Sequence, residues 1–380
     1  MLAAELTSGR QDLLDSDIRA DGSLLAASNA LRTIACGLVV LIHVNITIRP
    51  GIGTWWPAGF LFAPFFALPV PAFFMLSGLF SGRFSSLVSR PSLIAFIRKK
   101  TRTLIIPFFF WNTLLLLFAK AHQLPVARLV YFSLTGFWQL YYISVLLQLL
   151  ILHHLLESRI AGIGIRRIFG VAAALAVAFG ATADYLLWTR GAGSAFMETE
   201  LIGLFLPWSV FFAGGLWLRQ EKPALPWLDS KRYWLLFLTV LAYALFYAGL
   251  RIEDDRIGYN PLQQFLFAGL PFRLLSPLLF LVLLNRLLQA GWSTKLMARL
   301  ASGSRAVFGI YLSHTVVLTL LLAVRKTAGI ETTHWIEVPV LWGMTWFISK
   351  GLVTLARASR QPWGVIFGMT GRRPSADERR

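Results

Sequence analysis

Ten stretches of apolar residues, each long enough to cross a membrane, constrain the fold of this chain more than any other feature. A helix needs about 20 apolar residues to cross a hydrocarbon core about 30 Å thick. The stretches are continuously apolar and lack the alternation of barrel strands, so they predict helices. We therefore expect an all-α polytopic integral membrane protein, one bundle of about ten transmembrane helices at roughly 29–49, 59–82, 103–120, 135–156, 168–189, 201–218, 233–250, 265–288, 304–324 and 336–356.

The composition excludes an ordinary soluble protein. Hydrophobic residues make up 56% and charged residues 14% of the 380 residues, whereas soluble domains have roughly 45–50% and about 25%. No long polar stretch is present in which a soluble domain could form. A single cysteine, Cys36, excludes an intramolecular disulfide framework and a cysteine-based zinc site.

The distribution of basic residues predicts the orientation in the membrane. Loops on the cytoplasmic side carry an excess of lysine and arginine. Alternate loops place 26 of the 36 lysines and arginines on one side, so both termini are expected in the cytoplasm. The net charge of +18 then reflects topology, and no nucleic-acid partner is expected. We expect a polar tail at 1–28, a transmembrane domain at 29–356 and a basic tail at 357–380.

Arg32 and His43 form the first candidate site. Their separation of eleven residues puts both side chains on one face of a helix, about 16 Å apart. Arg32 is expected at the cytoplasmic mouth of the first span and His43 beyond its middle. Ionisable residues at such depth are costly and usually functional. The alternative is a histidine that only hydrogen-bonds between helices.

Five segments carry a resemblance to a known family. The stretch LRTIACGLVVLIHV (31–44) resembles the opening Arg/His motif of the membrane-bound acyltransferase 3 family. PAFFMLSGLFSG (71–82), FIRKKTRTLIIP (96–107) and SRAVFGIYLSH (304–314) are similar to its later motifs in order, and FWQLYYISVLL (137–147) matches more loosely. Thr33 replaces a common glycine and Gln139 interrupts an apolar motif, which leaves the substrate open.

The resemblance implies an acyltransferase of the inner (plasma) membrane with many spans. It would move an acyl group from cytoplasmic acyl-CoA to a hydroxyl of an extracytoplasmic carbohydrate or glycolipid, with acetyl-CoA and succinyl-CoA as the leading donors. His43, assisted by Arg32, would be catalytic, because imidazole can act as a base or carry an acyl group near neutral pH. The expected partners are the donor, the acceptor and the bilayer, and protein partners are left unknown.

Arg32, Arg98 and Arg102 are the candidates for binding the phosphates of the donor. Arginine suits phosphate because its guanidinium is planar and can donate two hydrogen bonds at once. The three residues are expected at the cytoplasmic face, near the starts of the first and third helices. Basic residues there also serve orientation and anionic lipids without binding any donor.

Four residues are candidates for binding the acceptor substrate. His314 is expected near the depth of His43, where substrate binding and packing are equally plausible, and Tyr311 on the same face is most simply an interfacial packing residue. Arg273 lies between Pro271 and Pro277, so it could bind substrate or satisfy carbonyls freed by the kink. Trp138 falls among aromatic residues that ordinarily form a belt at the outer interface and could also stack on a sugar, namely Trp55, Trp56, Tyr141 and Tyr142.

Two expectations concern packing and metals. Ser77 and Gly78 are small residues of the kind that permits close helix approach. No metal is expected, because the histidines lack a defensible ligand spacing.

Two other classes of function remain open. A transporter or flippase of a glycan or lipid-linked substrate would also need about ten spans and a broken helix. A membrane protein that assists polysaccharide assembly without catalysis is the third possibility.

Overall fold

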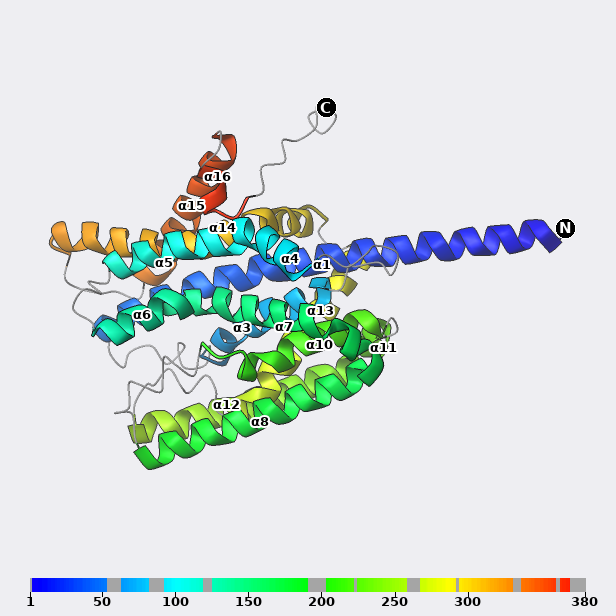
Figure 1. Cartoon of the computed structure of the whole chain (residues 1–380), viewed down its shortest axis with the longest axis horizontal. Coiled ribbons are helices and arrows are strands. Elements are labelled where there is room, and N and C mark those ends of the chain that lie inside the picture. Colours follow the sequence, from blue (N-terminus) through cyan, green and yellow to red (C-terminus); the bar gives the residue numbers. More distant parts are fainter. Residues whose placement is uncertain are drawn as a thin grey trace.

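The computed structural model describes residues 2–52, 63–81, 92–118, 125–190, 203–221, 224–257, 267–291, 294–330, 336–359 and 363–369. Every regular element within these ranges is helical, which confirms the predicted all-α class. Most of the long helices run along one direction and form a single bundle (Figure 1). The N-terminal part of α1 extends well beyond that bundle.

Long helices dominate the chain. Their bounds are α1 (Leu2–Ile52), α5 (Ile106–Phe118, preceded by α4 at Leu93–Lys100 and a π-helical segment at Thr101–Ile105), α7 (Tyr141–Ile163), α8 (Ile165–Arg190), α12 (Arg232–Ile257), α13 (Leu270–Gln289), α14 (Thr294–Thr327) and α15 (Glu337–Ala358). The shorter ones are α3 (Pro69–Ser81), α6 (Val126–Thr135), α10 (Ser209–Gln220), α11 (Ala224–Ser230) and α16 (Trp363–Ile366), with 3-10 turns at Ala63–Ala67, Trp138–Leu140, Leu206–Trp208 and Phe267–Gly269.

Eight helical segments in the described ranges are long and apolar enough to cross a membrane. The expected spans 59–82 and 201–218 correspond to shorter helical stretches, Phe65–Ser81 and 206–220. A multi-pass membrane protein is therefore supported by length and composition. The count of ten spans and the cytoplasmic location of the termini stay predictions.

The two expected tails differ in how the structure describes them. Residues 2–28 continue the first span as one helix, α1, instead of forming a separate element. Hydropathy marks where a helix enters the membrane, but not where the helix begins, because a helix can continue into water. At the other end, α16 lies within the expected tail, and residues 370–380 lie outside the described residues.

Helices α1 and α14 pack side by side and run parallel. The Thr33 hydroxyl donates to the Leu300 carbonyl at 2.7 Å, and the Cys36 thiol lies 3.6 Å from the Val307 carbonyl. Gly303 lets Thr33 approach, since a Cβ at that glycine would lie 3.1 Å from the threonine methyl carbon. Thr33, which departs from the family's glycine, thus contributes a hydrogen bond between the two helices.

Two glycines bring α3 and α10 into backbone contact. A Cβ added to Gly78 would lie 2.0 Å from the Phe212 carbonyl oxygen, and one added to Gly215 would lie 1.9 Å from the Met75 carbonyl oxygen. These are backbone atoms, which cannot rotate away as a flexible side chain can. The expected packing role of Gly78 is therefore what the structure shows, and Gly215 is its partner.

Substituting Gly78 with alanine should force α3 away from α10. Overpacking of this kind typically costs about 1–3 kcal/mol, so we expect a clearly lower midpoint of thermal unfolding in detergent. Gly170→Ala is the matched control, because no atom lies within 4 Å of a Cβ there and the position is helical. That control should be neutral or more stable by up to about 1 kcal/mol. Equal effects of the two substitutions would contradict the proposed contact.

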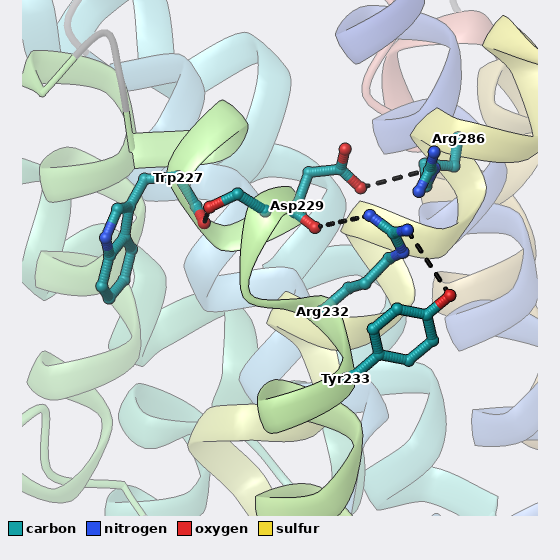
Figure 2. A network of polar contacts seen from close by, with 6 residues as sticks. Trp227, Asp229, Arg232, Tyr233 and Arg286 are labelled. Atoms are coloured by element: carbon teal, nitrogen blue, oxygen red, sulfur yellow. Dashed lines mark hydrogen bonds and ion pairs between the residues drawn. The ribbon is translucent and has the colours of Figure 1, made fainter.

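Polar contacts tie the short helix α11 to its neighbours (Figure 2). Arg286 of α13 lies 3.6 Å from the Asp229 carboxylate, and Arg232 donates to the Asp229 carbonyl at 3.2 Å and to the Tyr233 hydroxyl at 3.5 Å. Exposed ion pairs contribute little to stability, so this network mainly fixes the direction in which α11 joins α12.

A second polar contact joins the start of α8 to the end of α10. Arg166 donates two hydrogen bonds to the Glu221 carboxylate, both at 2.9 Å. These bonds, together with the positive charge, lower the pKa of the Glu221 carboxyl. The pair is exposed, and it orients the connection between α10 and α11 without adding much stability.

Candidate functional site

His43 and His314 lie against each other inside the bundle. Their ring centroids are 5.1 Å apart and the rings are tilted by 52°. The contact follows from the register of α1 and α14: Cys36 meets Val307, and seven residues further along both helices His43 meets His314. The two histidines expected at equal depth are thus brought together, with His43 partly exposed and His314 completely buried.

Hydrogen bonds within α14 hold the His314 ring. Its Nδ1 lies 2.8 Å from the Tyr311 carbonyl oxygen and 3.2 Å from the Ile310 carbonyl oxygen. Its Nε2 is buried and has no hydrogen-bond partner among the described residues. The ring is therefore fixed at one nitrogen and free at the other.

Tyr311 lies in the interior of the bundle, so its interpretation as an interfacial packing residue was wrong. The side chain is 4% exposed, and its hydroxyl donates to the Gln139 carbonyl. Its ring centroid is 6.0 Å from that of His314 and 5.5 Å from that of Tyr142. Tyr311 is buried because the face of α14 that it shares with His314 points toward α7.

Tyr142 is also buried, although the sequence placed it in the outer aromatic belt. The side chain is 7% exposed, its hydroxyl is 3.4 Å from the Ser77 hydroxyl, and its ring packs on Phe74 with centroids 4.7 Å apart. No pattern in the sequence distinguishes this tyrosine from the neighbouring aromatic residues. Only the packing of α7 against α3 and α14 shows it.

The Arg32 guanidinium lies within electrostatic range of the Tyr142 phenol. Arg32 is partly buried, and its guanidinium lies over the Phe80 ring, 4.7 Å from the ring centroid. It also donates a hydrogen bond to the Asn29 side chain at 3.3 Å. A cation over an aromatic face is held in a defined orientation.

These residues form what we call the central polar row: Arg32, Tyr142, Tyr311, His314 and His43. The row joins α1, α7 and α14, with Ser77 of α3 at its side. Ring contacts join the two phenols and the two imidazoles inside an apolar bundle, and the Arg32 guanidinium lies within electrostatic range of Tyr142. Such an arrangement can bind an anion at one end and transfer a proton or an acyl group at the other.

The helix that carries Tyr142 is broken just before it. Helices α6 and α7 lie nearly end to end (Figure 1) and are separated by Gly136 with φ +95° and Trp138 with φ +50°. A positive φ is uncommon for a residue as bulky as tryptophan. The expected span 135–156 thus has the break at its start, and a further helix, α6, precedes it.

Side chains from three helices satisfy the backbone groups at this break. Asn112 of α5 donates to the Phe132 carbonyl at 2.8 Å and accepts from the Phe137 amide at 2.8 Å. Ser144 donates to the Thr135 carbonyl at 2.7 Å, and Tyr311 to the Gln139 carbonyl. The Gln139 side chain donates to Thr315. Hydrogen bonds from three helices therefore stabilise the break, and Tyr311 connects it to the central polar row.

Asn112→Ala should destabilise the break between α6 and α7. Asn112 is 1% exposed, and the substitution leaves the Phe137 amide without its side-chain partner, whereas the Phe132 carbonyl still accepts from the Gly136 amide at 3.0 Å. An unpaired buried group costs about 1–3 kcal/mol, so thermal unfolding in detergent should occur at a clearly lower temperature. The neighbouring Thr113 is exposed, so Thr113→Ala serves as the control and should leave the midpoint nearly unchanged. An unchanged midpoint for Asn112→Ala would contradict the capping role.

Trp138 lies at the break and outside the central polar row. Its side chain is 54% exposed and stacks on Phe137 with centroids 5.5 Å apart. The structure leaves its predicted contact with acceptor substrate untested. Trp55 and Trp56 of the expected aromatic belt lie outside the described residues.

Arg98 and Arg102 are exposed on α4 and the π-helical segment that follows it. Within the described residues no contact joins either side chain to Arg32. Their role in binding the donor stays a prediction.

Arg273 is 4% exposed and donates to the Gly269 carbonyl at 3.1 Å. The charge of Asp184 on α8 also acts on it, and the Asp184 carboxylate accepts from the Phe267 amide at 3.2 Å. These contacts support the start of α13, but the Gly269 carbonyl is not one that Pro271 or Pro277 frees, so neither expectation for Arg273, repair of the kink or substrate binding, is tested. Among the residues that the structure describes, no group of three or more His, Cys, Asp or Glu could hold a metal ion.

The comparisons with known proteins gave one match. The acyltransferase 3 family model, described as an acyltransferase domain, matches residues 25–352. No curated protein and no solved structure matches the chain. The matched range contains every residue of the central polar row and all five motif segments.

Proposed function

The chain belongs to the acyltransferase 3 family, and from this premise we propose that it is an integral membrane O-acyltransferase of the inner (plasma) membrane. It would transfer an acetyl or succinyl group from cytoplasmic acyl-CoA to a hydroxyl of an extracytoplasmic carbohydrate or glycolipid. The acceptor would be part of a polysaccharide or lipid-linked sugar. The observation that carries the proposal is the central polar row inside the matched domain.

The end of the row at Arg32 suits the donor. Coenzyme A carries phosphates, and a partly buried guanidinium oriented by Phe80 is well placed to bind one of them. Arg98 and Arg102 are exposed and could bind the remaining phosphates. Arg32 would then hold the donor so that its thioester reaches the row.

The end of the row at His43 suits the chemical step. Imidazole can accept the proton of the attacking hydroxyl or carry the acyl group briefly. His43 is partly exposed, so a substrate could reach its ring, and His314 and Tyr311 lie beside it to contact the acceptor. Arg273 and Trp138 are further candidates for binding the acceptor.

The proposal is tested by measuring free coenzyme A. Membranes or proteoliposomes that contain the protein should release coenzyme A from acetyl-CoA or succinyl-CoA when acceptor glycan is present, and not in its absence. Mass spectrometry of envelope glycans from cells with and without the protein would identify the group added. Identical glycans in the two strains would contradict the proposal.

Transport is the second candidate, because of the break between α6 and α7. Secondary transporters build their sites from broken helices. A transporter or flippase predicts exchange of labelled glycan across proteoliposomes without any acyl donor. Such exchange, together with no release of coenzyme A, would favour transport. If wild-type, Arg32→Ala and His43→Ala proteins restored a deletion strain equally, a non-catalytic assembly role would be favoured instead.

A further inference from the structure

The protonation of the His314 ring can be read from its neighbours. Nδ1 faces two backbone carbonyl oxygens, at 2.8 Å from Tyr311 and 3.2 Å from Ile310. Carbonyl oxygens can only accept hydrogen bonds, so Nδ1 must carry a hydrogen. A neutral imidazole carries one hydrogen, which leaves Nε2 with a bare lone pair.

That lone pair is buried and unpaired in the described structure. His314 is 0% exposed, and its Nε2 has no hydrogen-bond partner. Protonating Nε2 would place an unpaired positive charge in the interior, which costs far more than a neutral ring. A buried acceptor without a donor is itself costly, so this nitrogen is suited to receive a hydrogen bond from a bound molecule.

The neighbouring histidine is held differently. No described residue bonds either ring nitrogen of His43, and this side chain is partly exposed. The Thr47 hydroxyl bonds only the His43 backbone carbonyl, at 2.7 Å. The two imidazoles are thus inequivalent, because one is fixed as an acceptor and the other is free to turn toward a substrate.

We propose that His314 Nε2 is the proton acceptor for the attacking hydroxyl of the acceptor substrate, and this inference rests on the proposed function. A His43 ring nitrogen first bonds the acyl carbon, the bond from that carbon to the sulfur of coenzyme A breaks, and the thiolate takes the His43 ring proton. As the O–H bond of the attacking hydroxyl then breaks, its proton moves to His314 Nε2 and the oxygen forms a bond to the acyl carbon. The bond between the acyl carbon and His43 breaks, and His43 takes the proton from His314, which leaves the ester, free coenzyme A and two neutral imidazoles.

The contact with Tyr311 links this role to the fold. The Tyr311 backbone carbonyl holds the His314 Nδ1 hydrogen, while the Tyr311 hydroxyl bonds the Gln139 carbonyl at the helix break. Orientation of one imidazole nitrogen by a hydrogen bond to the other is the usual way a protein sets which nitrogen is basic. Tyr311 is therefore a positioning residue for His314.

The first experiment measures the tautomer without any activity. In protein labelled with 15N-histidine, the resonances of His314 are assigned by comparing wild type with His314→Gln in lipid bilayers. We expect a protonated Nδ1 and an unprotonated Nε2 at neutral pH. A protonated Nε2 in the resting protein would overturn the proposal.

The second experiment separates proton transfer from packing. In His314→Ala, release of coenzyme A should fall by at least about 100-fold, and added imidazole should restore part of it. Pyrazole is the matched control, because it has the same shape but is a much weaker base, and it should not restore the rate. Equal rescue by both compounds, or rescue by neither in a variant that unfolds at the wild-type temperature, would overturn the inference. If His314→Ala does not fold, the tautomer measurement decides.

The proposed function and the proposed role of His314 would be contradicted by different results. If wild-type protein releases no coenzyme A with any donor and acceptor, the proposed function fails. If the wild-type protein is active and a correctly folded His314→Gln variant keeps its rate to within about twofold, only the role of His314 fails. General-base catalysis contributes about 100- to 10,000-fold, so its loss would be far larger than that.

Discussion

Replacing His43 with alanine is expected to reduce release of coenzyme A by about 100- to 10,000-fold, the range that a positioned acid, base or related catalytic group contributes. His43 lies against His314 with ring centroids 5.1 Å apart, so it can carry the acyl group beside the imidazole that we propose as proton acceptor. The rate should be measured in proteoliposomes at saturating acyl-CoA and acceptor. Loss at saturation would place the defect in the chemical step.

Thr47→Ala is the matched control for His43. Thr47 is exposed on the same helix, one turn further on, and its hydroxyl bonds only the His43 carbonyl. We expect a rate close to that of wild type. If His43→Ala were as active as Thr47→Ala, His43 would have no catalytic role, whether as a base or as a carrier of the acyl group.

Replacing Arg32 with glutamine should weaken use of the donor by roughly 10- to 100-fold in kcat/KM. A hydrogen bond to a charged group contributes about 1.5–3 kcal/mol, which corresponds to roughly this factor. The effect should appear mainly as a higher KM for acyl-CoA. Arg32→Lys should restore little, because lysine keeps the charge but lacks the planar guanidinium that lies 4.7 Å above the Phe80 ring.

Lys99→Ala controls for general loss of positive charge at the same face. Lys99 is exposed on α4, and we expect less than a twofold change in KM, because exposed charges contribute little. A rise in KM for Lys99→Ala as large as for Arg32→Gln would favour diffuse attraction of the donor. Full activity of Arg32→Lys would show that the charge alone suffices.

Much of the fold follows from local sequence. Runs of apolar residues require helices, because unpaired backbone groups are too costly in lipid, and most of the described residues in the predicted spans are helical. The break at Gly136 and Trp138 was missed, since the chain stays apolar through it. Its stability depends on Asn112 and Tyr311, which come from other helices.

The candidate site was predictable only in part. Helical period placed Arg32 and His43 on one face, and topology placed His314 near the depth of His43. The same reasoning put Tyr142 in the outer belt and Tyr311 at an interface, although both are buried beside the histidines. An aromatic residue in an apolar run has the same pattern whether it faces lipid or the interior.

The sequence by itself determined the class of the protein: a helical membrane chain with an acyltransferase motif order and an arginine and a histidine on one face of its first span. Hydropathy and helical period are properties of consecutive residues, so they can be read without knowing the neighbours. Only the tertiary structure decided that His43 meets His314 and that Nδ1 of His314 is held by its own helix. Those facts depend on the register of α1 against α14, whose contacting residues Cys36 and Val307 are 271 positions apart in the sequence. Packing between the two helices sets that register, and no local pattern encodes it.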